Sequence, residues 1–180
     1  YNVYVYSTNM KKIISFKKFN KKRLKWAISL NKDKKVNQLS KNLYVSADKH
    51  NFCYLYNWLG EPMLQTPDDI VAQQEIIFKT KPNVIIETGV CWGGSILFYN
   101  MLSKIVPIKK IIGIDIFIPR QLKKRLMKKC GSKLVLFEED STNQNLIKKI
   151  KKLVKNYKNF YVHLDSSHTY EHVLKELNIY

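Results

Sequence analysis

The sequence predicts an α/β fold with a mostly parallel sheet, and three observations predict it. Four short apolar runs have starts 22 to 28 residues apart: 83–88, 111–116, 133–140 and 160–166. A helical pattern follows each run, and the first run, NVIIET, is β-branched without polar alternation, as in strands buried on both faces. Because strands joined by crossover helices run parallel, the four units should form one sheet with helices on both faces.

The helices have recognisable ends. One should begin at TPDD, with Thr66 as N-cap and Pro67 in the first turn, and continue to about Lys81, before Pro82. Its apolar face should carry Ile70, Val71, Gln74, Ile77 and Phe78. The later helices are expected at 94–105, at 120–130 with Gly131 closing it, after a capping box of Ser141 and Gln144, and from about Tyr170.

Composition separates a lead-in at 1–50 from a domain at 51–180. Residues 1–50 hold 13 basic and two acidic residues, a net charge of +11 out of +18 for the chain. Only three of the 32 basic residues are Arg, which argues against nucleic acid as a partner. The basic segment 11–30 has scattered apolar residues, so both a solvated arm and contact with an anionic membrane surface stay open.

Cysteine usage and hydropathy bear on location. The three cysteines are far apart and form no CxxC, which favours a reducing, cytoplasmic compartment over a disulfide framework or a zinc site. No apolar run reaches 18 residues, so we expect no transmembrane segment. The sequence is compatible with a homo-oligomer and does not define one.

The first predicted strand leads into a glycine turn, IIETGVCWGGS. Glycine allows a positive φ and a close approach of backbone to a ligand, and the following helix offers free N–H groups. The spacing is G-x-x-x-G-G rather than G-x-G-x-x-G, and no Gly-Lys-Ser/Thr follows, which disfavours a pyrophosphate ligand. A ligand carboxylate would suit this helix end, and a tight turn without a ligand is the alternative.

Each predicted strand ends in acid, at the sheet edge where such folds bind ligands. Asp115 could hold the ribose of a ligand, and the alternative is a surface residue that ends a strand. Ser141 could lie beside the base of the same ligand, and the alternative is a helix cap. Asp165 could hold a divalent metal, and His168 could act as a general base. The alternative is that Ser166, Ser167 or Thr169 caps a helix and His168 is a surface residue. His163 and His172 are interpreted as structural.

These motifs together resemble the cephalosporin hydroxylase family, whose relatives include rhamnosyl and macrolide-sugar O-methyltransferases. The resemblance runs from about Trp58 to Tyr180 and includes IIETGVCWGGS, IIGIDI, FEEDS and LDSSHTYEHVLKEL. It implies a Rossmann-like class I methyltransferase fold, S-adenosylmethionine (SAM) as cofactor and Mg²⁺. By position, it implies a methionyl site (Glu87, Gly89, Gly93, Gly94, Ser95), a ribose ligand (Asp115), an adenine site (Asp140, Ser141), a metal ligand (Asp165) and a base (His168).

The resemblance also implies a reaction and a departure from the family. The expected function is O-methylation of a hydroxyl on a surface polysaccharide or glycosylated metabolite, with a small-molecule or saccharide acceptor. The other metal ligands of the family would follow Tyr180, so we expect a fold truncated after the fourth strand–helix unit. The alternatives are a truncated non-catalytic SAM-binding fold, an NAD-dependent oxidoreductase and an RNA-modifying methyltransferase.

Overall fold

The computed structural model describes residues 15–180, so the first four residues of the basic segment 11–30 lie outside the described residues. Contacts within the chain divide it into two compact units, of which the first ends at His50 and the second begins at Asn51. Within residues 15–180, no helix is long and apolar enough to cross a membrane.

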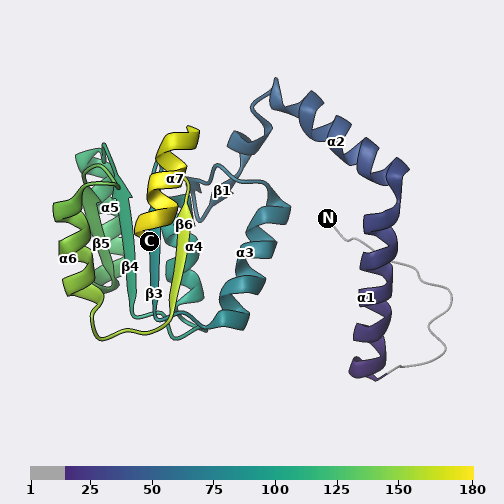
Figure 1. Cartoon of the computed structure of the whole chain (residues 1–180), viewed down its shortest axis with the longest axis horizontal. Coiled ribbons are helices and arrows are strands. Elements are labelled where there is room, and N and C mark those ends of the chain that lie inside the picture. Colours follow the sequence, from purple (N-terminus) through teal and green to yellow (C-terminus); the bar gives the residue numbers. More distant parts are fainter. Residues whose placement is uncertain (1–14) are drawn as a thin grey trace. The chain divides into compact units, whose positions relative to one another are not determined.

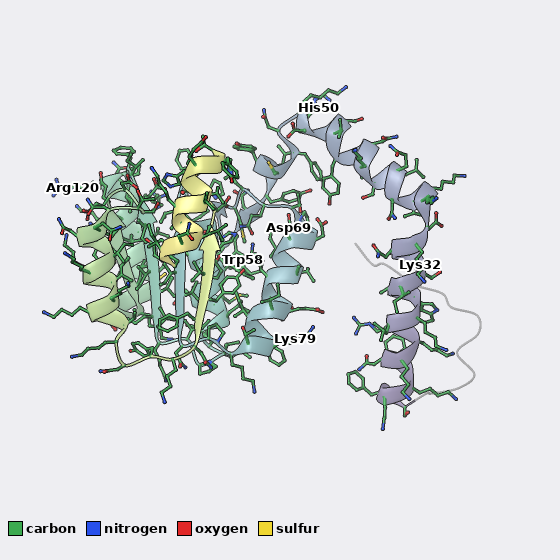
Figure 2. The ribbon with its side chains drawn as sticks, in the orientation of Figure 1. Lys32, His50, Trp58, Asp69, Lys79 and Arg120 are labelled. Atoms are coloured by element: carbon green, nitrogen blue, oxygen red, sulfur yellow. The ribbon has the colours of Figure 1, made fainter. Side chains whose placement is uncertain are left out.

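From residue 15 onward, the first unit contains two helices that the sequence reasoning did not anticipate. Helix α1 (Phe16–Lys32) begins after the N-cap Ser15, and helix α2 (Lys34–Asp48) follows the single residue Asp33. Asp33 ends one helix and caps the next, because its carboxylate accepts from the backbone N–H groups of Lys35 and Val36. Neither helix contains a buried residue, and both extend their side chains from the ribbon in Figure 2.

The second unit opens with a 3₁₀ turn η1 (Phe52–Leu55) and an antiparallel ribbon of β1 (Asn57–Trp58) and β2 (Glu61–Pro62). Helix α3 (Pro67–Thr80) begins at the predicted N-cap Thr66 and ends at Lys81. The predicted apolar face is partly wrong. Ile77 is fully buried and Ile70 packs against the core, whereas Val71 and Phe78 are exposed, because only one edge of α3 meets the sheet layer.

The four predicted strands form one parallel sheet, which confirms the fold class. They are β3 (Val84–Thr88), β4 (Lys110–Asp115), β5 (Leu134–Glu138) and β6 (Phe160–Leu164), in the order β5-β4-β3-β6. The connecting elements are α4 (Gly94–Leu102), α5 (Arg120–Cys130), the 3₁₀ turn η2 (Gly131–Lys133) and α6 (Gln144–Val154). Helix α7 (Tyr170–Ile179) follows β6 and crosses in front of the sheet in Figure 1.

The core lies on both faces of this sheet, as strands buried on both sides require. On one face Ile85 and Ile111 pack with residues of α3, α4 and α5. On the other face Val84, Ile86 and Ile112 pack with α6. The chain builds β3, β4 and β5 outward in one direction and then returns to place β6 on the other side of β3. The switch point between β3 and β6 is where open α/β sheets bind ligands.

The predicted capping box at Ser141 is wrong. Helix α6 begins at Gln144, and its N-cap is Asn143, whose side chain accepts from the backbone N–H groups of Asn145 and Leu146. Ser141 instead turns inward and is buried, because its hydroxyl has partners on α7. Asn143 satisfies free N–H groups at the true start of α6, those of Asn145 and Leu146, as a helix N-cap does.

Candidate functional site

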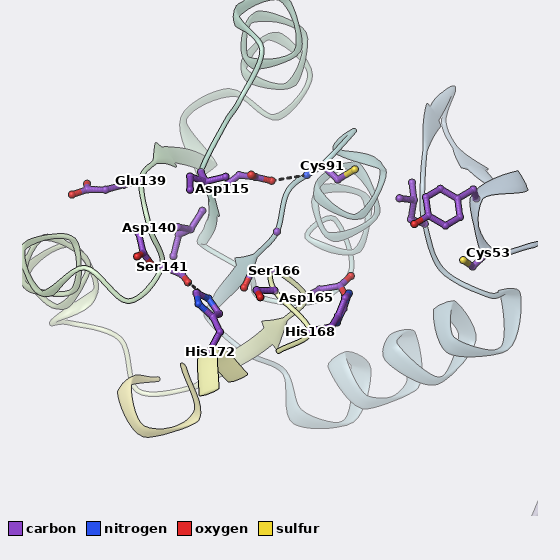
Figure 3. Close-up of a pocket in the computed structure, with 16 residues that line it drawn as sticks. Cys53, Cys91, Asp115, Glu139, Asp140, Ser141, Asp165, Ser166, His168 and His172 are labelled. Carbon is purple, nitrogen blue, oxygen red and sulfur yellow. Dashed lines mark hydrogen bonds and ion pairs between the residues drawn. The ribbon is translucent and has the colours of Figure 1, made fainter. Parts of the chain in front are cut away.

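A cavity of about 600 Å³ lies at the carboxyl ends of the strands (Figure 3). Its walls come from η1, the turn after β3, and the segments that follow β4, β5 and β6. They include six residues of the predicted site: Gly89, Asp115, Asp140, Ser141, Asp165 and His168. A smaller adjoining pocket is lined by Gly94 and Ser95 together with Gly89 and Asp165. The volume of the first cavity, about 600 Å³, lies within the range of small-molecule and cofactor sites.

The glycines of the turn after β3 are required by packing within the protein. Gly89 has a φ of +91°, and a Cβ there would overlap the backbone carbonyl of Asp165, with the carbonyl carbon only 2.6 Å away. A Cβ on Gly94 would lie 2.7 Å from the Cβ of Met63, and one on Gly93 would meet the side chain of Leu126. The structure therefore accounts for these glycines by the close approach of β6, β2 and α5 to the turn.

Glu87 lies behind the turn and does not line the cavity. Its side chain is 1% exposed and accepts hydrogen bonds from the hydroxyls of Ser95 (2.8 Å) and Tyr99 (3.1 Å). Its Oε1 is also 3.1 Å from Nδ1 of His163, its register partner on β6. Burial raises the pKa of Glu87. Burial alone would lower the pKa of His163, but the hydrogen bond and charge of Glu87 raise it.

The network around Glu87 continues to α3. The hydroxyl of Tyr99 lies 3.1 Å from Nδ1 of His163, and Nε2 of the same ring is 3.4 Å from Nε2 of Gln65. Gln73 donates to Gln65 at 2.7 Å. These side chains form a partly buried polar scaffold under the turn, and it rigidifies the turn because its members are hydrogen-bonded to one another.

Asp115 is held by the turn that it faces. One of its oxygens accepts from the backbone N–H groups of Val90 (2.8 Å) and Cys91 (2.9 Å), and the other accepts from Phe117 N–H at 3.2 Å. Figure 3 shows the bond to Cys91. Cys91 adopts a φ of +46°, which is unusual for a residue with a side chain. The hydrogen bonds from the N–H groups of Val90 and Cys91 to Asp115 hold the backbone in that conformation. A carboxylate has about four acceptor positions, so Asp115 keeps capacity for a ligand hydroxyl.

Asp140 and Ser141 follow β5 and face the cavity at a second polar cluster. Ser141 donates to Oε1 of Glu176 at 2.6 Å, and its oxygen is 3.1 Å from Nε2 of His172. The hydroxyl of Ser166 donates to the same Glu176 oxygen at 2.8 Å. This is not a nucleophile–base–acid relay, because Ser141 and Glu176 both meet the same nitrogen of His172.

Two electrostatic effects accompany this cluster. The backbone N–H of Thr142 lowers the pKa of Asp140 below its usual range, so this carboxylate is ionised at the cavity edge near neutral pH. Burial raises the pKa of Tyr180 far above its usual range, and its hydroxyl donates to the carbonyl of Ser141 at 2.8 Å. The hydrogen bonds from Thr142 to Asp140 and from Tyr180 to the Ser141 carbonyl hold the backbone that carries Ser141 in place.

Asp165 and His168 lie at the end of the cavity nearest β6. Nε2 of His168 is 3.9 Å from Oδ1 of Asp165, and the imidazole is 82% exposed. Burial raises the pKa of Asp165, which is partly enclosed beside the turn. Among residues 15–180, no group of three or more His, Cys, Asp or Glu side chains is arranged to hold a metal ion.

Sequence reasoning interpreted His163 and His172 as structural, and it missed the other side chains that support this site. Tyr99 and Gln65 brace Glu87 and His163, and Glu176 braces Ser141 together with His172. Of the side chains that were missed, only Glu176 could have been found from the sequence, because a carboxylate on the inward face of a predicted helix needs buried partners. The other side chains sit in ordinary amphipathic patterns that carry no signal of their contacts.

Comparison with known proteins places this geometry in a family. The family model described as rhamnosyl O-methyltransferase/CmcI matches residues 50–180. The rhamnosyl O-methyltransferase of Mycobacterium leprae (strain TN) is 30% identical over 125 residues, which cover 68% of this chain and 52% of that protein. The solved structure of CmcI-N160 with SAH is 25% identical, with a TM-score of 0.50, over 67% of this chain and 58% of that one.

The chain therefore spans about half the length of the curated relative that it matches. The matched region includes the whole parallel sheet, the glycine turn and every residue that lines the cavity. Since the family model covers most of the chain, this protein belongs to the rhamnosyl O-methyltransferase/CmcI family.

Proposed function

We propose that residues 51–180 form the cofactor half of a SAM-dependent O-methyltransferase. The observation that carries this proposal is the cavity at the β3–β6 switch point, where Asp115, Ser141 and Asp165 converge in a chain of this family. The SAH in the CmcI-N160 structure supports the cofactor class. The name of the M. leprae relative supports a saccharide hydroxyl as the acceptor, on a polysaccharide or a glycosylated metabolite.

The residues that line the cavity fit such a cofactor. Asp115 offers a carboxylate for ribose hydroxyls beside the apolar side chain of Ile116, which is suited to a purine face. The Ser141 hydroxyl donates to Glu176 and lies beside His172, which leaves one oxygen lone pair to accept from an adenine amino group. Gly89 and Ser95 line the adjoining pocket at the start of α4, where N–H groups favour the methionyl carboxylate. Glu87 and Gly93 act indirectly, by supporting the turn.

The chemistry asked of the protein is modest. SAM supplies an electrophilic methyl group when bound, and the protein has to hold the acceptor oxygen in line with it. His168 is exposed at the cavity and accepts the proton of the acceptor hydroxyl. Asp165 lies 3.9 Å from that imidazole, so a carboxylate stands beside the proposed base.

Magnesium has no step in this proposal. The described residues offer one cavity carboxylate beside one imidazole, Asp165 and His168, and such a pair does not make a magnesium site, since Mg²⁺ demands near-octahedral oxygen ligation.

We propose a cytoplasmic location, which the three free cysteines support.

The first experiment is calorimetric titration of SAH into the folded chain. We expect binding, loss of binding in Asp115→Asn, and retention in Glu139→Gln, which makes the same charge change at the same cavity. A folded chain that binds no SAH would contradict the proposal. Retained affinity in Asp115→Asn would remove Asp115 from the cofactor site.

Methyl transfer is then measured with saccharide acceptors and labelled SAM. His168→Ala should keep SAH affinity and lower the rate by about 10²–10⁴-fold, the usual contribution of a general base. Tyr170→Phe, a change at an exposed residue just after the same loop, should change neither quantity. A chain that binds SAH and methylates no saccharide would contradict the catalytic half of the proposal and favour a non-catalytic SAM-binding fold.

A further inference from the structure

Helix α1 combines strong positive charge with an uncovered apolar face. Within Phe16–Lys32 there are seven basic residues and no acidic residue. The large apolar side chains are all exposed: Phe16 by 76%, Phe19 by 40%, Trp26 by 57% and Leu30 by 58%. No residue of the helix is buried, so nothing in residues 15–50 of the first unit explains why these side chains are apolar.

Four of the six large apolar side chains of α1 gather on one side of the helix, and most of its lysines lie on another. At 3.6 residues per turn, Phe16, Phe19, Trp26 and Leu30 fall within a sector of about 80°. We call these four residues the aromatic face; Phe19 and Trp26 stack edge to face within it, with ring centroids 6.2 Å apart. Five lysines fall in a different sector, whose centre lies roughly 135° from that of the aromatic face: Lys18, Lys21, Lys22, Lys25 and Lys32.

We propose that the aromatic face of α1 binds the surface of an anionic lipid bilayer. A basic amphipathic helix with low overall hydropathy and with Trp, Phe and Leu on one side lies in the interface plane of such a membrane. The indole of Trp26 has an apolar body and a polar N–H, which suits the headgroup boundary. Arg23 lies on the same side as the aromatic face, and its long stem lets the guanidinium reach the lipid phosphates.

Charge and side-chain chemistry favour a lipid surface over a nucleic acid. A duplex would engage the lysine side alone and leave the aromatic face in water, whereas a bilayer engages both sides at once. Six of the seven basic residues are Lys, and base-edge recognition relies mainly on the Arg fork. The helix cannot cross the bilayer, because it is 17 residues long and charged throughout.

The test is flotation of the full chain with vesicles of phosphatidylcholine alone and of phosphatidylcholine mixed with phosphatidylglycerol. We expect binding to the anionic vesicles only, weakened by added salt. Leu30→Ser should weaken binding about tenfold, since one leucine contributes roughly 1.5–3 kcal/mol when buried. Ile28→Ser is the matched control: Ile28 is also exposed, but it lies outside the aromatic face among the lysines, and its loss should leave binding unchanged.

A charge variant tests the other side of the helix. The double variant Lys18→Gln, Lys25→Gln should weaken binding to anionic vesicles about thirtyfold, since each lysine contributes about 1 kcal/mol at such a surface. Circular dichroism would establish that every variant keeps its helices. Equal binding by the Leu30 and Ile28 variants would overturn the role of the aromatic face. Absence of vesicle binding by the unaltered chain, with or without binding to duplex RNA, would overturn the proposal. Neither result depends on SAH binding.

Discussion

The glycine turn allows a sharp test of what its first glycine is for. Gly89 and Gly60 have nearly the same φ, +91° and +85°. A Cβ on Gly60 would meet nothing within 4 Å, whereas one on Gly89 would overlap the backbone carbonyl of Asp165. Replacing each by alanine therefore separates the cost of the clash from the cost of the dihedral angle.

The expected magnitudes follow from these surroundings. Gly60→Ala should lower the free energy of unfolding by about 1 kcal/mol, because a positive φ costs alanine roughly 1–2 kcal/mol and the stiffer unfolded chain returns part of it. Gly89→Ala adds an overlap with main-chain atoms, and overpacking typically costs about 1–3 kcal/mol more. The carbonyl of Asp165 cannot rotate away as a side chain would, because β6 pairs with β3 up to Leu164.

The assay is urea unfolding followed by tryptophan fluorescence. With a slope of about 2 kcal/mol per molar urea, a 2 kcal/mol difference moves the midpoint by about 1 M. We expect the Gly89 variant to unfold at clearly lower urea than the Gly60 variant. Equal urea midpoints would refute the claim that the Asp165 carbonyl requires a glycine at position 89. The remaining explanation would be that only the approach of a ligand requires Gly89.

Three further outcomes are expected. Glu61→Gln should lower the free energy of unfolding by about 1–2 kcal/mol, reduced by solvent screening of the half-exposed Arg125 that pairs with it at 3.0 Å. The hydrogen bond from Arg125 lowers the pKa of Glu61 in the folded protein. This stabilisation is therefore present above the ordinary Glu pKa of about 4.3 and is lost as pH falls through the lowered pKa of the folded state. The urea midpoints of the Glu61→Gln variant and the parent protein should therefore converge in acid. Asn143→Ala should cost about 1 kcal/mol by urea unfolding because it removes the cap of α6, with Asn145→Ala as the near-neutral control. Burial raises the pKa of the Cys130 thiol to about 11, so iodoacetamide should label Cys130 far more slowly than a free thiol of pKa about 8.5, until the chain is unfolded; equal labelling rates would contradict its burial.

The sheet was predictable because its signals are local. Each strand is a short apolar run, each helix has an apolar period, and the crossover rule converts their alternation into a parallel sheet. Arg120–Cys130 has the predicted bounds, since Gly131 at φ +63° marks its end. The helices of the first unit were missed because their apolar side chains face no core and so form no interpretable burial pattern.

The gathering of Asp115, Asp140 and Asp165 at one cavity was also predictable, because parallel strands present their carboxyl ends at the same edge. The orientation of Glu87 was not. It is two residues before Gly89, yet it points into the scaffold of Tyr99 and His163, because strand alternation and helix packing together decide which face each side chain meets.

The sequence alone determined the fold class, the order of its units and the edge of the sheet at which the cavity lies, because these depend on periodicity and on the handedness of connections. Only the tertiary structure decided that Gly89 is required by Asp165 and that Ser141 is held by Glu176 rather than capping a helix. These contacts join residues 76 and 35 positions apart, and their energy depends on atomic distances that exist only once helices and strands have packed.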